Sequence, residues 1–145
     1  MSHLDDLYKE VILDHYRSPR NRGELPAPAV KVEGHNPLCG DEITLFLAVE
    51  GDVVTDIKMT GHGCSISQAS SSLMSAAIKG KSVIDVRQII DQFKNMMSLE
   101  EGAEPVNPRA MGELAALSGV AQFPVRIKCA TLAWNTLLQA LDESA

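Results

Sequence analysis

The chain has 145 residues, of which 45% are hydrophobic and 22% are charged, a composition typical of one soluble globular domain. A domain of this length buries roughly 68–70% of its unfolded surface, so it needs neither disulfides nor a metal merely to form a core. The formal net charge of -6 argues against nucleic acid as a partner, because proteins that bind phosphate backbones carry basic patches. We expect a single domain over residues 1–145.

The N-terminus carries no signal for export or for membrane insertion. Asp5 and Asp6 stand where a signal peptide would be apolar, and no stretch approaches about 18 consecutive apolar residues. The cysteine count of 3 is odd, which disfavours a disulfide framework. We therefore expect a cytoplasmic protein that does not bind or cross a membrane.

The first half of the chain predicts one helix and then strands. Apolar residues recur at helical spacing over residues 3–17, and Pro19 follows the end of this pattern. A connector rich in Gly and Pro covers residues 23–28 and should lie extended on the surface. Three β-rich stretches follow, at residues 30–32, 43–49 and 53–59, with Glu50-Gly51-Asp52 as a hairpin turn between the last two. This order predicts a small antiparallel meander.

The second half predicts helices. Residues 65–78 form a helix that stops before Gly80, and residues 83–97 form one with an apolar stripe. Residues 99–106 are acidic, and Asn107-Pro108 predicts a short helix that closes near Gly119. Pro124 begins the last helix, whose apolar face comprises Ile127, Leu132, Trp134, Leu137, Leu138 and Leu141. Strands followed by helices predict an α+β fold, a three-stranded antiparallel sheet with helices packed on one face.

The three cysteines lie in three different local settings. Cys39 falls between two predicted strands, Cys64 directly precedes a helix, and Cys129 lies in the first turns of the last helix. None is spaced as C-x-x-C, so only folding can bring them together. Asp41 supplies a fourth candidate ligand, and three thiolates with one carboxylate suit tetrahedral zinc. The unpaired amides of a helix N-terminus would favour thiolates at Cys64 and Cys129.

Core packing is the alternative role for each cysteine, because free cysteine is among the most buried residue types. The two roles are equally compatible with the surroundings of Cys129, which lies between Ile127 and Leu132. For Cys39 and Cys64 the sequence favours a role in a site over core packing, because their neighbours Gly, Asp, His and Ser suit a site better than a core.

Other polar residues near the cysteines also have possible roles that involve neither a metal nor catalysis. Asp41 by itself would more often be a turn residue or an exposed acid at a strand start. His35 and His62 could bind a metal, but a lone histidine is more often a surface or hydrogen-bonded residue. The serine run at residues 70–72 has no nucleophile elbow or paired base, and it predicts a closely packed helix face.

Together these segments resemble the SufU branch of the IscU/NifU N-terminal family over nearly the whole chain. The resemblance rests on the following segments: Asp14-His15-Tyr16-Arg17-Ser18-Pro19-Arg20-Asn21, Leu38-Cys39-Gly40-Asp41, Gly61-His62-Gly63-Cys64-Ser65-Ile66-Ser67, and residues 123–134. It implies a role in iron-sulfur cluster assembly, with sulfur supplied by a pyridoxal-phosphate cysteine desulfurase of the SufS type and passed to downstream assembly proteins. The family fold, a small antiparallel sheet packed with helices, agrees with the predicted elements.

Two departures separate this chain from IscU-type scaffolds within that family. Such scaffolds carry histidine immediately before the third cysteine, where this chain has Lys128, and they lack the extra segment that we place at about residues 98–120. Both features resemble the SufU type, whose members are zinc-dependent sulfur acceptors, or sulfurtransferases. The resemblance implies a zinc site formed by Cys39, Asp41, Cys64 and Cys129.

Cys39 is the expected sulfur acceptor in this interpretation. It lies on a loop next to Gly40, so it can leave a metal more readily than Cys129 on its helix. We expect docking on the desulfurase to exchange a partner side chain for Cys39 on zinc, after which Cys39 attacks the desulfurase persulfide. Arg126 would steady the developing negative sulfur or the ligand set.

Two other functions use the same residues. The first is a scaffold for a [2Fe-2S] cluster, since soft thiolates bind zinc, iron and iron-sulfur clusters alike; Lys128 counts against it. The second is a structural zinc domain, in which the metal only ties loops together. The size of the chain counts against that second function, because such a domain folds without a metal.

Overall fold

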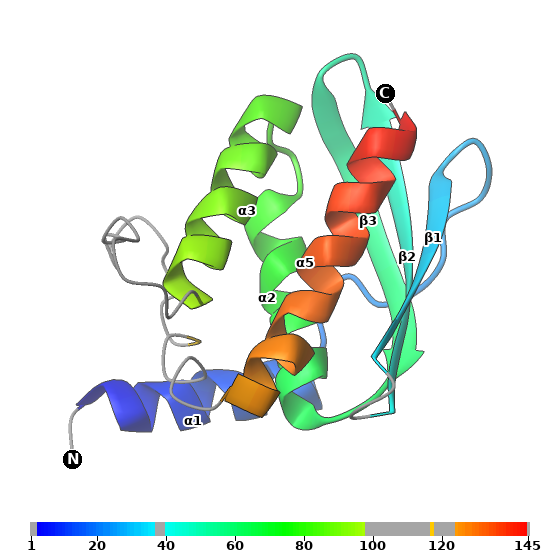
Figure 1. Ribbon diagram of the computed structural model, residues 1–145. Helices are drawn as coiled ribbons and strands as arrows, with labels where there is room; N and C mark the ends of the chain where they lie inside the picture. The colour runs from blue at the N-terminus through cyan, green and yellow to red at the C-terminus, as the bar shows by residue number, and fades with distance from the viewer. Residues whose placement is uncertain (1–2, 37–39, 98–116, 118–123, 145) are drawn as a thin grey trace.

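The computed structural model describes residues 3–36, 40–97, 117 and 124–144 (Figure 1). Cys39 lies outside these residues, as do the inserted segment at 98–120 and the short helix predicted after Asn107, apart from Leu117. Leu117 is fully buried. Among the described residues, no helix is both long enough and apolar enough to cross a membrane.

The strands form one antiparallel sheet in the order β1-β2-β3, as predicted. The strands are β1 (Val30–Asn36), β2 (Asp41–Glu50) and β3 (Val53–His62). Asn36 pairs with Asp41, Glu42 pairs with His62, and Gly51 turns the β2-β3 hairpin with a positive φ of 61°. Each strand extends beyond its predicted stretch, because pairing with its neighbour recruits residues of low intrinsic strand preference.

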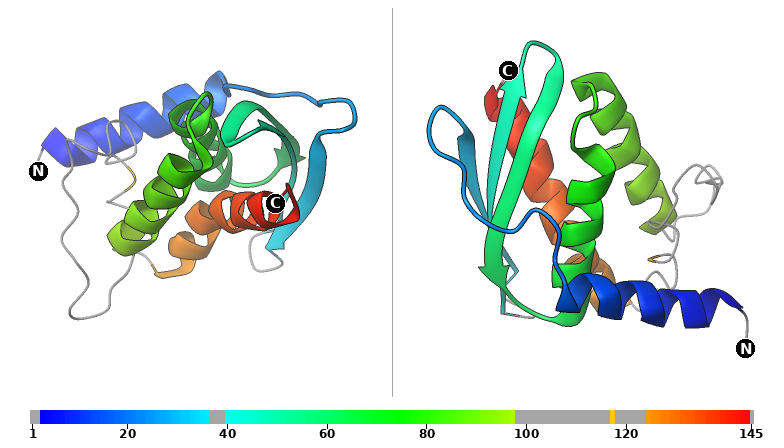
Figure 2. Two further views of the ribbon diagram at one scale, coloured as in Figure 1. Left: turned by 90° about the horizontal axis from the view of Figure 1, so that it is seen from above. Right: turned by 180° about the vertical axis from the view of Figure 1, so that it is seen from behind.

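The helices agree with the sequence prediction. They are α1 (His3–Arg17), α2 (Ser65–Ile78), α3 (Val83–Met97) and α5 (Pro124–Ser144). Figures 1 and 2 show them on one side of the sheet, with α2 and α5 nearest to it, α3 outside them, and α1 crossing α2. This is the predicted α+β arrangement with helices on one face.

The core fills the space between the sheet and the helices α2 and α5. Its largest fully buried side chains include Leu45, Leu47, Ile57, Met74 and Leu137. On the outer side, α3 packs through Phe93, whose ring stacks on Trp134 with centroids 4.2 Å apart. These layers bring the end of β3, the start of α2 and the start of α5 to the same end of the molecule (Figure 1).

Small side chains let α2 lie close to its neighbours. Its buried residues include Ser67, Ser70, Ser71, Ser72 and Ser75, as the serine run predicted. Ser72 accepts a hydrogen bond from the backbone N–H of Arg20 (2.8 Å), and its hydroxyl lies 2.7 Å from His15 Nδ1. Ser72 thus links α2 to α1 and to the segment that follows α1 by hydrogen bonds.

Candidate metal centre

Three of the four predicted ligands come together at this end of the molecule. A carboxylate oxygen of Asp41 and the sulfur atoms of Cys64 and Cys129 all lie within 4.8 Å of one another. Asp41 begins β2, Cys64 immediately precedes α2, and Cys129 lies in the second turn of α5. In the part of the chain that the structure describes, no other three His, Cys, Asp or Glu residues meet this closely.

Asp41 is fully buried, so it is not an exposed acid, and it belongs to β2, so it is not a turn residue. Its Oδ1 accepts a hydrogen bond of 2.8 Å from the backbone N–H of Cys64. Its Oδ2 lies 3.9 Å from Cys64 Sγ. A buried carboxylate is costly unless hydrogen bonds or a cation compensate it, so its position beside two thiols favours a cation site.

Cys64 caps the N-terminus of α2. Its backbone is extended, with φ -69° and ψ 164°, and its sulfur accepts a hydrogen bond of 3.5 Å from the backbone N–H of Ser67. This is the geometry in which Ser, Thr or Asp usually caps a helix. Cys64 therefore lies directly ahead of a helix, as the sequence predicted, at a helix N-terminus that attracts negatively charged ligands.

Two glycines make room for this arrangement. Gly61 and Gly63 have φ values of +145° and +157°. A Cβ at Gly63 would overlap Asp41 Oδ1, and a Cβ at Gly61 would overlap the backbone oxygen of Glu42. The glycines therefore allow the chain between β3 and α2 to pass directly over Asp41.

Cys129 takes both roles considered for it in the sequence. Only 3% of its surface is exposed, and it belongs to the hydrophobic core, yet its sulfur lies within the three-ligand group. Neither Cys64 nor Cys129 forms a disulfide. Arg126 and Lys128 flank Cys129 and are exposed, and Arg126 lies three residues earlier on the same side of the helix.

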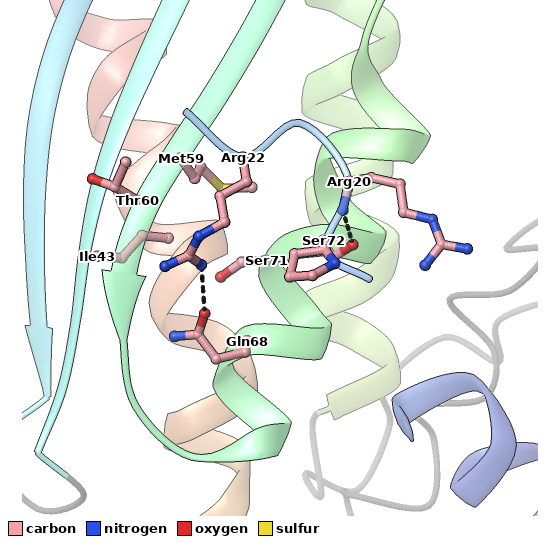
Figure 3. Close-up of a pocket in the computed structure, with 9 residues that line it drawn as sticks. Arg20, Arg22, Ile43, Met59, Thr60, Gln68, Ser71 and Ser72 are labelled. Atoms are coloured by element: carbon pink, nitrogen blue, oxygen red, sulfur yellow. Dashed lines mark hydrogen bonds between the residues drawn. The ribbon is translucent and has the colours of Figure 1, made fainter. Parts of the chain in front are cut away.

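Arg22 braces the turn that carries Cys64, a role that the sequence did not indicate. Its guanidinium donates to the backbone oxygen of Gly61 (3.1 Å) and to Gln68 Oε1 (3.5 Å), joining the end of β3 to the first turns of α2 (Figure 3). The backbone of Arg22 also bridges to Met59 in β3. Arg22 lies just before the Gly- and Pro-rich connector, and nothing in the sequence around it signals this contact.

Neither of the two candidate histidine ligands belongs to the three-ligand group. His35 Nδ1 lies 3.6 Å from one oxygen of Glu42, and His62 Nε2 lies 3.2 Å from the other. All three side chains are largely exposed. Glu42 follows Asp41, and successive strand residues point to opposite faces, so this row lies on the side of the sheet away from the helices.

Comparison with known proteins places the chain among iron-sulfur assembly proteins. Residues 7–142 match the model of the NifU-like N-terminal domain family. The chain is 46% identical over 136 residues to the zinc-dependent sulfurtransferase SufU of Bacillus subtilis, covering 94% of this chain and 90% of that protein. It is 42% identical to the iron-sulfur cluster assembly scaffold protein IscU of Streptococcus pyogenes, covering 100% and 89%.

A solved structure agrees with this grouping. The structure of a putative iron-sulfur cluster assembly scaffold protein for the SUF system from Fervidobacterium islandicum superposes with a TM-score of 0.83. It is 36% identical in sequence and covers 94% of this chain and 97% of its own. The likeness therefore extends over sequence and fold together.

Proposed function

Because this chain belongs to the NifU-like N-terminal domain family, we propose that it is an iron-sulfur cluster assembly protein acting as a zinc-dependent sulfur acceptor. The observation that carries the proposal is the convergence of Asp41, Cys64 and Cys129 from three separate elements. Its similarity to a zinc-dependent sulfurtransferase supports the same function. The sulfur donor would be a pyridoxal-phosphate cysteine desulfurase of the SufS type, with other iron-sulfur assembly proteins downstream.

The described ligands fit zinc. Zinc binds Cys sulfur at about 2.3 Å and carboxylate oxygen at about 2.0–2.2 Å, so a tetrahedral site separates these two ligand atoms by about 3.5 Å. The observed separation of Asp41 Oδ2 and Cys64 Sγ is 3.9 Å. Asp41, Cys64 and Cys129 would hold the ion, and Cys39, two residues from Asp41 in the chain, is the proposed fourth ligand. Bound zinc would keep the cysteine ligands deprotonated at neutral pH.

Cys39 is the proposed sulfur acceptor. In the transfer step its thiolate attacks the terminal sulfur of the desulfurase persulfide, and a new sulfur-sulfur bond forms on Cys39. The bond between that terminal sulfur and the desulfurase cysteine breaks, and the desulfurase cysteine leaves as a thiolate. No external oxidant or reductant is needed, because the persulfide oxidation level moves intact from one cysteine to the other.

The surroundings of the cysteines support Cys39 as the acceptor and Cys64 and Cys129 as metal ligands. Cys129 is buried on a helix, and Cys64 is held by the amide of Ser67 and by the contact of its own amide with Asp41. Both are therefore better suited to hold a ligand position than to move. Arg126, exposed one turn before Cys129, is proposed to stabilise negative charge on sulfur during transfer.

The experiment that tests this function measures persulfide on the chain after incubation with desulfurase and cysteine. Mass spectrometry should find one added sulfur atom on Cys39 in the wild type and none in Cys39→Ser. Cys64→Ala is the comparison, because it removes a ligand but keeps the acceptor. Persulfide formation at the wild-type rate in Cys39→Ser would overturn the assignment of the acceptor.

The [2Fe-2S] scaffold remains the second candidate function, and iron would then replace zinc. It is supported by the similarity to scaffold proteins and by the two thiolates, which suit iron-sulfur clusters as well. Metal analysis of anaerobically purified protein distinguishes the two functions. Near one zinc per chain with little iron or acid-labile sulfide supports the sulfur acceptor, whereas two irons matched by sulfide supports the scaffold.

A further inference from the structure

Ser70, a buried serine of α2, forms hydrogen bonds to α5. Ser71 donates to the backbone oxygen of Ser67, four residues earlier in its own helix, at 2.9 Å. Ser70, in contrast, donates across to the backbone oxygen of Ala130 in α5 at 2.6 Å. The same hydroxyl accepts the indole N–H of Trp134 at 3.0 Å. Ser70 thus has a donor and an acceptor bond to α5.

The bond from Ser70 is placed next to a metal ligand. Ala130 directly follows Cys129, and α2 carries Cys64 at its N-terminus, so one hydroxyl joins the two cysteine-bearing helices. Ser70, Ala130 and Trp134 are all fully buried, so water does not compete for these bonds. The position of Trp134 is itself set by stacking on Phe93.

We infer that Ser70 is a positioning residue that sets the separation of Cys64 and Cys129. The inference rests on the proposed zinc site. The carbonyl of Ala130 is already within reach of its own helix N–H four residues on, so α5 does not need the serine to satisfy it. The additional bond from Ser70 instead fixes how α5 is rotated about its axis and how far it is shifted along α2. The position of the Cys129 sulfur depends on both.

The test compares zinc affinity, measured by competition with a chromogenic chelator, in the full-length wild type, Ser70→Ala and Ser71→Ala. Ser70→Ala should bind zinc about tenfold more weakly, as expected when a residue that orients ligands is lost. Ser71→Ala is the matched control, because its hydroxyl bonds only within α2, and it should bind like the wild type. The absorption spectrum of bound cobalt should change in Ser70→Ala alone, because its bands report ligand geometry.

The outcomes separate this inference from the proposed function. Wild-type zinc affinity and an unchanged cobalt spectrum in a folded Ser70→Ala variant would overturn the positioning role and leave the zinc site standing. A wild type that binds neither ion would overturn both. If Ser70→Ala does not fold, Trp134→Phe replaces it, since it removes the indole donor and keeps a ring against Phe93. Weaker zinc binding in Trp134→Phe would then support the inference, and unchanged binding would overturn the contribution of the Trp134–Ser70 bond to it.

Discussion

Gly63 lies directly against the carboxylate of Asp41, and a Cβ at residue 63 would overlap Asp41 Oδ1. The backbone of Gly63 also has a φ of +157°, a conformation that residues with a side chain rarely adopt. Beyond Gly63, the N–H of Cys64 reaches the same oxygen. The buried acid and the turn that carries Cys64 therefore depend on each other.

We expect Gly63→Ala to disrupt the metal centre more than it disrupts the fold. The overlap should displace Asp41 and weaken zinc binding by at least about tenfold. The strained backbone should lower the free energy of unfolding by about 1–3 kcal/mol. Chelator competition and urea unfolding measure the two effects. Gly80→Ala is the control, since Gly80 has φ +83° but nothing near its added Cβ, and it should keep wild-type zinc affinity.

Asp41→Asn should separate the charge of this side chain from its hydrogen bond. The amide oxygen can still accept from the N–H of Cys64, so the fold should survive, whereas the loss of a carboxylate ligand should weaken zinc binding about 10- to 100-fold. Circular dichroism and chelator competition test the two parts. Glu42→Gln, one residue along on the opposite face, should bind zinc normally. Wild-type affinity in Asp41→Asn would show that this carboxylate does not bind the metal.

Phe93→Ala should be among the most destabilising changes in α3. Its side chain is fully buried and stacked on Trp134, so truncation leaves a cavity that costs about 3–5 kcal/mol. Urea unfolding followed by circular dichroism gives the difference in free energy. Ile84→Ala in the same helix is the control, because 68% of Ile84 is exposed and its loss should change stability by less than about 0.5 kcal/mol. A small effect at Phe93 would contradict this packing.

The ion pair between Asp14 and Arg20 should be visible in a titration. Arg20 Nη2 lies 2.7 Å from Asp14 Oδ2, and this hydrogen bond lowers the pKa of Asp14 below its ordinary value of 3.8. Because the folded pKa is the lower one, the pair stabilises the fold above the pKa of the unfolded carboxyl. That contribution is lost as pH falls through the folded pKa.

Arg20→Gln should therefore raise the pKa of Asp14 toward 3.8, as followed by NMR of the side-chain carboxyl carbon. Arg17→Gln is the control, since Arg17 is not among the causes of the shift, and it should leave the pKa of Asp14 low. An unaltered titration of Asp14 in Arg20→Gln would show that another group lowers its pKa.

Local signals in the sequence were sufficient for the helices but not for the strand ends. The end of α2 before Gly80 and the start of α5 at Pro124 agree with the prediction, because caps, prolines and helical periodicity are encoded in neighbouring residues. The strand residues His35 and Asn36 carry no such signal. They become strand by pairing with β2, a contact that depends on distant residues.

For the candidate site too, the sequence predicted some features and missed others. The sequence indicated that Cys64 would directly precede a helix and that its neighbours suit a site better than a core. It did not distinguish a core role from a ligand role for Cys129, and it favoured a turn or an exposed position for Asp41 by itself. The sequence did not indicate that Arg22 and Ser70 support the site, because each contacts residues more than 35 positions away in the chain.

The sequence by itself determined the order and type of the elements, the identity of the candidate ligands and the resemblance to an iron-sulfur assembly family. These depend on composition, periodicity and motifs that are read along the chain. Only the tertiary structure decided that Asp41 is buried and that its carboxylate meets the sulfurs of Cys64 and Cys129. The physical reason is that packing of α2 and α5 on the sheet sets these distances, and packing is a property of the whole core.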